Sequence, residues 1–150
     1  MSDATSSQSI RFARFWPTPK SYPPGAGTPG PSDLKTAYQH ARQSLTLAGD
    51  IERLRAYALD ALGQVEAARQ NWGQAVEHFE RSIALRSEGG DRHLAARTQR
   101  HYAEMLLQKG EPEEAVELFQ AALATFQELG LAHEVAETQR LLDTGKTQKG

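Results

Sequence analysis

Histidine offers this chain its most direct route to chemistry, because an imidazole can bind a metal ion or move a proton near neutral pH. The chain has five of them, at His40, His78, His93, His101 and His133. They do not form the His-Glu-x-x-His pattern or another spacing typical of a metal site. We interpret His78, on the flank of an expected helix, as structural. The histidines therefore predict neither a metal centre nor an acid–base catalyst.

Two other patterns resemble functional groups but lack the parts that such sites need. Gly145-Lys146-Thr147 matches the end of a phosphate-binding loop, yet Arg140 stands where the loop's earlier glycine is required. The pairs Glu77–Glu80 and Glu113–Glu114 lie on helix surfaces, where nothing orients them as an acid and a base. The chain has no cysteine, which excludes thiolate chemistry. We therefore expect no catalytic residue, no cofactor, no metal and no enzymatic activity.

The overall composition excludes further classes of protein. The net charge is -2 over 150 residues, which does not indicate the basic surface of a nucleic-acid-binding protein. No apolar run approaches the roughly 18 residues that cross a membrane. Residues 1–6 lack the basic start and apolar stretch of a secretory signal. We therefore expect a cytoplasmic protein that does not enter a membrane.

The first 31 residues differ in composition from the rest of the chain. They hold most of the prolines, together with several glycines and serines, so we expect an extended or disordered arm over residues 1–31. An aromatic and basic cluster interrupts this arm, at Phe12, Arg14, Phe15 and Trp16. The cluster could pack on the protein's own helices or dock on another protein. Stacking on nucleic-acid bases is less favoured, because the arm has few cations.

Apolar residues recur at helical spacing from Ser32 onward. Capping residues, glycines and one proline divide this region into six expected helices, at about 32–48, 51–69, 75–88, 92–109, 112–129 and 132–142. The short connections place neighbouring helices antiparallel. We expect an all-α domain over residues 32–144, followed by a flexible tail at 145–150.

The helical region repeats itself at an interval of forty residues. Ala75-Val76-Glu77-His78-Phe79 returns as Ala115-Val116-Glu117-Leu118-Phe119, and Thr98-Gln99-Arg100 returns as Thr138-Gln139-Arg140. Self-similarity at a fixed period of this size is the signature of a solenoid, in which each unit buries its apolar face against the next. Solenoids usually present surfaces to partners and seldom carry out catalysis.

These residues resemble the tetratricopeptide repeat (TPR) family. Leu62-Gly63 matches the Leu-Gly pair of the family's first helix, while residues 71–75 and 110–115 match its turn and following alanine. Phe79 and Phe119 stand four residues further on, where the family has its aromatic. The period of forty, rather than 34, is similar to the variants in kinesin light chains and many bacterial regulators. The resemblance implies a short right-handed α-solenoid of about six helices, with two full repeats flanked by half-repeats.

The resemblance also implies where a partner would bind. In such repeats the first helix of each pair lines a concave face, which here would carry Tyr57, Gln64, Arg97, Arg100, His101, Glu104 and Arg140. The three arginines would give this face a basic streak suited to carboxylates. Alternatively, these are ordinary solvated charges. The chaperone-binding members use a Lys/Asn clamp, which Asp60, Gln64 and Glu104 do not reproduce, so that class of partner is disfavoured.

Together these features predict a non-catalytic protein–protein interaction module, such as an adaptor, a scaffold or an assembly factor. The partner would be a protein or peptide segment, held mainly by the arm and secondarily by the concave face. The first alternative is a structural subunit or self-oligomer, assembled through the apolar side of the first helix. A nucleic-acid-binding accessory protein is less favoured.

Overall fold

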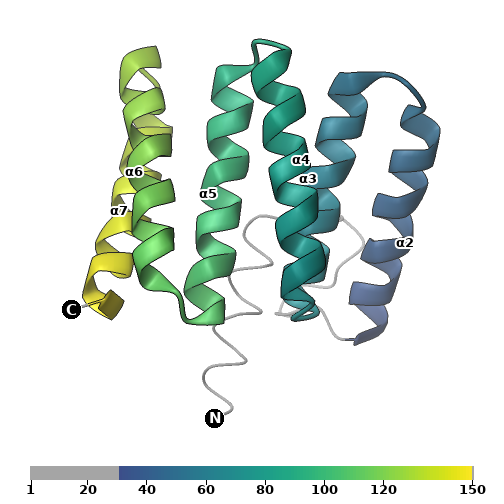
Figure 1. Ribbon diagram of the computed structural model, residues 1–150, viewed down its shortest axis with the longest axis horizontal. Coiled ribbons are helices and arrows are strands. Elements are labelled where there is room, and N and C mark those ends of the chain that lie inside the picture. The colour runs from purple at the N-terminus through teal and green to yellow at the C-terminus, as the bar shows by residue number, and fades with distance from the viewer. Residues whose placement is uncertain (1–30, 150) are drawn as a thin grey trace, which may run out of the picture.

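The computed structural model describes residues 31–149, and this part of the chain contains helices and no strand. In chain order the helices are α2 (Pro31–Ala48), α3 (Glu52–Ala68), α4 (Trp72–Glu88), α5 (Arg92–Lys109), α6 (Pro112–Leu129) and α7 (Ala132–Lys149). Figure 1 shows them side by side, from α2 at one end to α7 at the other. The expected all-α fold is therefore confirmed. Over the same residues, none of the helices is both long and apolar enough to cross a membrane.

The helices stack in two layers. Each helix packs on the next along the chain, and further contacts join α3 to α5 and α5 to α7. The helices α3, α5 and α7 therefore form one layer, and α2, α4 and α6 form the other (Figure 1). The pairs α3–α4 and α5–α6 are the two full repeats, while α2 and α7 are the half-repeats. This is the stacked arrangement of a solenoid, in which each unit packs mainly on its neighbours.

The repeated phenylalanines lie at the centre of the helix pairs. Phe79 of α4 and Phe119 of α6 are 1% and 0% exposed, as the forty-residue repeat predicts. A Cβ added to Gly63 of α3 would lie 2.7 Å from the Phe79 ring, closer than real side-chain atoms approach. Phe79 also stacks on Tyr102 of α5, with ring centroids 5.9 Å apart. One aromatic side chain thus joins three helices, and the glycine opposite it permits the close approach.

The connection between α5 and α6 has the structure that its sequence predicts. Gly110 has a φ of 93°, the left-handed conformation that closes a helix, and Pro112 is the first residue of α6. The connection before α4 is shorter than expected, because Trp72 already begins that helix.

The C-terminal end differs from the expectation. We expected the last helix to end near residue 142 and a flexible tail to follow, but α7 continues to Lys149. The reason is that Gly145 is buried in the interface with α5 and α6. A Cβ at this position would lie 3.2 Å from Val116 and 3.5 Å from Leu107. The last turns of α7 therefore still cover part of the core.

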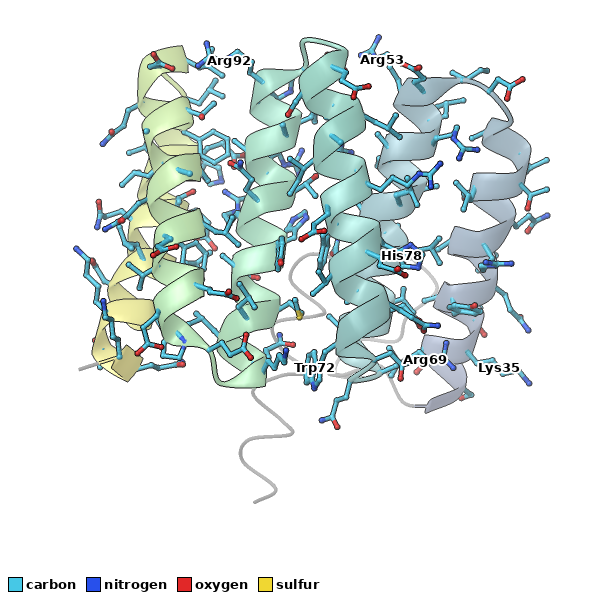
Figure 2. All side chains as sticks on the ribbon, viewed as in Figure 1. Lys35, Arg53, Arg69, Trp72, His78 and Arg92 are labelled. Carbon is cyan, nitrogen blue, oxygen red and sulfur yellow. The ribbon has the colours of Figure 1, made fainter. Side chains whose placement is uncertain are left out.

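The N-terminal end is more polar than we expected. Ala37 and Ala41 of α2 are buried, and Tyr38 and Leu45 are half-buried. Leu47, at 76% exposure, is the exception. The remaining exposed side chains of α2 are polar, among them Lys35, Gln39, Arg42, Gln43 and Thr46, and Lys35 points away from the neighbouring helices (Figure 2). Most of the apolar residues of α2 thus pack against α3 and do not form an exposed apolar surface at this end of the stack.

Candidate functional site

Three cavities follow one another along the seam between α3 and α5. The first, of about 480 Å³, is largely apolar and is lined by Ile51, Arg53, Leu54, Tyr57, Arg86, Asp91 and Leu94. The second, of about 510 Å³, is lined by residues of α2, α3, α4 and α5 that include Tyr57, Asp60, Gln64, Arg86, Leu94, Arg97 and His101. The third, of about 30 Å³, lies next to Gln64, His101 and Glu104. Neighbouring cavities share lining residues, and we call the three cavities together the α3/α5 groove.

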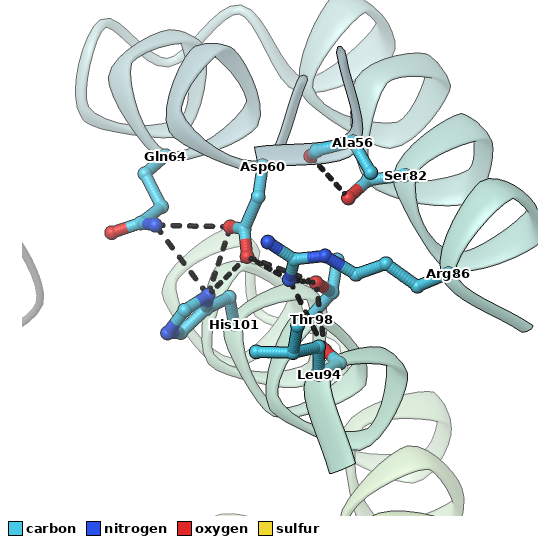
Figure 3. A network of polar contacts seen from close by, with 8 residues as sticks. All are labelled: Ala56, Asp60, Gln64, Ser82, Arg86, Leu94, Thr98 and His101. Carbon is cyan, nitrogen blue, oxygen red and sulfur yellow. Dashed lines mark hydrogen bonds and ion pairs between the residues drawn. The ribbon is translucent and has the colours of Figure 1, made fainter. Parts of the chain in front are cut away.

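The floor of the groove is a buried polar network centred on Asp60 of α3, shown in Figure 3. Arg86 Nη1 of α4 and Thr98 Oγ1 of α5 donate to Asp60 Oδ2 over 3.1 and 2.9 Å. On the other carboxylate oxygen, Gln64 Nε2 donates over 2.9 Å and His101 Nδ1 lies at 2.9 Å. The network ties three helices together beneath the groove.

Electrostatics keep Asp60 ionised. Burial by itself would raise the pKa of this carboxyl. The charges of His101 and Arg86, together with the hydrogen bonds that the carboxylate accepts, outweigh that effect and hold the pKa of Asp60 well below its usual range. The polar side chains on the floor of the groove therefore hold one another in place, and the negative charge of Asp60 is balanced within this network.

The second repeat holds a related network with the charges reversed. Arg100 occupies the position forty residues after Asp60, and its guanidinium pairs with Glu134 of α7. It also lies near Thr138, the equivalent of Thr98, and over the ring of Phe126 at 5.6 Å. Arg100 is 6% exposed. This arginine therefore joins α5 to α7 and is not presented to a partner.

The predicted site residues separate into three groups. Tyr57, Gln64, Arg97 and His101 lie together in the second cavity, with Tyr57 60% exposed and His101 held against Asp60. Glu104, 2% exposed, lines the third cavity with Gln64 and His101. Arg100 and Arg140 line none of the three cavities.

The expected basic streak is not formed. Arg140 is exposed but engages Glu137 on its own helix through two hydrogen bonds, and Arg100 is buried. Arg97 is exposed and makes no ion pair among residues 31–149, so it is the cation of the predicted set that remains available in the groove. The arm residues Phe12, Arg14, Phe15 and Trp16 lie outside the described part of the chain.

An apolar strip at the first cavity was missed. Leu47, Ile51 and Leu54 are 76%, 57% and 51% exposed, although Leu54 stands at helical spacing with the other apolar residues of α3. The reason is that, among residues 31–149, α3 is the first helix of its layer and has α5 alone beside it within that layer. A repeat preceding α3 would cover this strip, so the half-repeat at the N-terminal end was the signal that could have revealed it.

In the part of the chain that the structure describes, the side chains form no cluster suited to a metal ion. Over residues 31–149 no group of three or more histidine or carboxylate side chains is placed to hold a metal ion. His78 is half-buried, and this burial lowers its pKa.

A family model for the tetratricopeptide repeat matches residues 54–128, which is half of the chain. The protein therefore belongs to the tetratricopeptide repeat family. No curated protein matches the chain, and no solved structure does. Repeats of this family generally mediate protein–protein interactions and are typically non-catalytic.

Proposed function

We propose that this protein is a non-catalytic adaptor or scaffold that binds an extended segment of another protein in the α3/α5 groove. The observation that carries the proposal is the meeting of Leu54, Tyr57 and Arg97 in this groove. The first two are large and more than half exposed, and the third is a cation with no ion pair among the described residues. Exposed apolar side chains beside a charged rim are typical of an interaction site.

The two kinds of side chain have different parts in binding. Covering Leu54 and Tyr57 would supply affinity, at about 25 cal/mol for each Å² of apolar surface removed from water. Arg97 would fix the direction of the segment through a bidentate contact with a carboxylate. The preferred segment therefore carries an apolar side chain for the first cavity and an acidic side chain for Arg97.

The arm remains part of the proposal, although it lies outside the described residues. Phe12, Phe15 and Trp16 offer enough apolar surface for a contact with a partner, and Arg14 adds charge. We assign the first contact to this cluster and a second contact to the groove. Removal of the arm and substitution of groove residues should then have separable effects on partner binding.

Self-assembly is the second candidate, and the exposure of Leu47 and Ile51 favours it. Ile51 lines the first cavity of the groove, Leu47 extends the apolar strip beyond it, and a second copy could cover both side chains. The polar character of the rest of α2 argues against a large interface of this kind. Analytical ultracentrifugation at several protein concentrations distinguishes the two functions, because an adaptor sediments as a monomer without its partner.

The adaptor function is tested by selecting binders from a random peptide library displayed on phage, with the full chain as bait. We expect enrichment of peptides that combine an apolar and an acidic residue. The enriched pool should lose binding to Arg97→Glu and keep binding to Arg81→Glu, a matched control on an exposed position of α4. A pool that binds both variants equally would contradict the assignment of the groove.

A further inference from the structure

Exposed apolar side chains gather at one end of the helical stack. Among residues 31–149, five large hydrophobic side chains are exposed, and four of them stand between positions 47 and 57. These four are Leu47, Ile51 and Leu54 of the apolar strip and the adjoining Tyr57, whereas Leu129 is the fifth. Three of the four also line the first cavity, of about 480 Å³. An apolar surface concentrated in this way is typical of a site that another segment of protein covers.

The order of the repeats indicates where in the chain a covering segment would stand. In each full repeat the first helix lies in the layer of α3 and the second in the layer of α2. The helix α2 is a second helix, so the first helix of its pair would precede it in the sequence. A segment in that place would lie beside α3, over the apolar strip, and would cap the end of this layer. The order of the helices thus points to residues before Pro31.

One segment before Pro31 has the composition to cover the strip. Residues 10–16 read Ile-Arg-Phe-Ala-Arg-Phe-Trp and contain the aromatic and basic cluster, whereas the rest of the first 30 residues consists largely of proline, glycine and polar residues. The first cavity, at about 480 Å³, lies within the range of pockets that hold small ligands. An aromatic side chain of the cluster would therefore fit into it.

The cluster is close enough in the chain to reach the strip. Figure 1 shows α2 running from its N-terminal end at the lower edge to its connection with α3 at the upper edge. The 18 residues of α2 measure about 27 Å, at about 1.5 Å for each residue. The 14 residues from 17 to 30 can span about 43 Å, at about 3.1 Å for each residue of an extended chain. This reach is enough to place Trp16 beside the far end of α2.

The charges beside the strip suit the two arginines within residues 10–16. Asp50 and Glu52 stand on either side of Ile51 in the sequence, are exposed, and make no ion pair among residues 31–149. The neighbouring cations are engaged, since Arg53 pairs with an aspartate of the next connection and Arg55 donates to a backbone carbonyl. Exposed ion pairs contribute little affinity. They would instead orient the segment on the strip.

We propose that residues 10–16 cover the apolar strip of their own chain when no partner is bound, with an aromatic side chain in the first cavity. The proposal rests on the proposed function, because the partner uses the same cavity and the same cluster. Covering the strip removes apolar surface from water, but the entropy lost by ordering the segment offsets much of this gain. The contact is therefore weak enough for a partner segment to displace. Displacement opens the groove and frees the cluster for its own contact with the partner.

The contact is tested by NMR on the full chain with a nitroxide spin label at Ser9→Cys. The label has a single site of attachment, because the chain itself has no cysteine. Broadening of the ¹⁵N-labelled amide signals is measured against the same sample with the label reduced. We expect at least a twofold loss of signal at residues 47–57 and no loss at Leu129, the exposed leucine of α6.

Variants of the arm and of the strip identify the side chains that make the contact. The triple variant Phe12→Ser/Phe15→Ser/Trp16→Ser should remove the broadening. The matched control Tyr22→Ser, which changes an aromatic residue of the arm outside the cluster, should leave it unchanged. Leu54→Gln should reduce the broadening at least twofold. A peptide selected on the groove should restore the signals, and peptide binding with the broadening unchanged would contradict the displacement of the arm.

Three further results would overturn the contact. They are the absence of broadening at residues 47–57, equal broadening at Leu129, and broadening that persists in the triple variant. A mixture of spin-labelled chain with ¹⁵N-labelled chain lacking the spin label reports contacts between copies. Broadening in this mixture as strong as in the single sample would also overturn the contact, because the strip would then be covered by a second copy.

The spin-label measurement needs no partner, so the two proposals can fail separately. Absence of broadening with peptide selection intact rejects the contact of the arm with the strip and leaves the proposed function standing. Failed peptide selection with the broadening intact rejects the proposed function alone.

Discussion

Asp60 of α3 and Arg86 of α4 form an ion pair whose side chains are 7% and 6% exposed, with Arg86 Nη1 3.1 Å from Asp60 Oδ2. A buried pair of this kind is costly to break, because the remaining charge has no water to solvate it. Here the pair also receives a hydrogen bond from Thr98 of α5. The floor of the groove and the packing of the first repeat thus depend on the same atoms.

Breaking this pair from one side should strongly destabilise the fold. We expect Asp60→Leu to cost about 3–5 kcal/mol of unfolding free energy, since it leaves Arg86 buried without its carboxylate. The double variant Asp60→Leu/Arg86→Met should be more stable than the single one. Urea denaturation of both variants measures the difference. A double variant less stable than Asp60→Leu would mean that the pair is not coupled as the geometry indicates.

The depressed pKa of Asp60 predicts an acid dependence with a definite sign. The folded state holds the carboxyl ionised, so its contribution is complete at pH values above the unfolded pKa of about 3.9. This contribution is lost as the pH falls below that value toward the lower pKa of the folded state. Stability curves between pH 7 and pH 2 should therefore fall more steeply for the wild type than for Asp60→Asn. Parallel curves would exclude Asp60 as a source of acid sensitivity.

The repeated phenylalanines should be equally important in both repeats. Truncation of Phe79 or Phe119 to alanine creates a cavity in the core, and such changes typically cost about 3–5 kcal/mol. A domain of this size has a total stability of only about 5–15 kcal/mol. Thermal melts should show a clear decrease for each variant. Unchanged melting temperatures would refute the placement of these rings.

Two glycine-to-alanine substitutions on neighbouring helices should have opposite effects. At Gly63 the new Cβ would lie 2.7 Å from the Phe79 ring, so overpacking should cost about 1–3 kcal/mol. At Gly73, near the start of α4, no atom lies within 4 Å of the new Cβ. Alanine there should stabilise the protein by about 0.4–1 kcal/mol. Chemical denaturation of both variants tests the close approach of α3 and α4.

Removal of residues 1–30 should leave the helical domain folded. The helices of residues 31–149 bury apolar residues against one another, among them Phe79, Phe119 and Phe126. Circular dichroism and thermal melting should therefore change little, while binding of a partner should weaken because the arm makes the first contact. Loss of the fold, or undiminished binding, would contradict this division between arm and groove.

The helices were predictable because their signals are local. Gly110 and Pro112 mark a helix boundary by backbone conformation alone, and the forty-residue repeat of Phe79 and Phe119 predicts where helix pairs meet. The extension of α7 to Lys149 was not predictable in this way. It depends on Gly145 meeting side chains of α5 and α6, which no local pattern records.

The candidate site was only partly predictable for a similar reason. Equivalent positions in a repeat share a face of a helix but not a charge environment. Position 60 carries an aspartate, which pairs with Arg86. Position 100 carries an arginine, which pairs with Glu134. Arg97 and Arg100 were therefore expected together in the groove, although only Arg97 is presented there. Which charge stays available depends on side chains from other helices.

The most direct test of the groove is isothermal titration calorimetry with one selected peptide. The full chain is compared with Tyr57→Ala, Arg97→Glu and the control Arg81→Glu. We predict that the first two variants each weaken binding by about tenfold or more, equivalent to at least about 1.4 kcal/mol, while the control retains the wild-type Kd. Wild-type affinity in both groove variants would show that the partner binds elsewhere and would contradict the account.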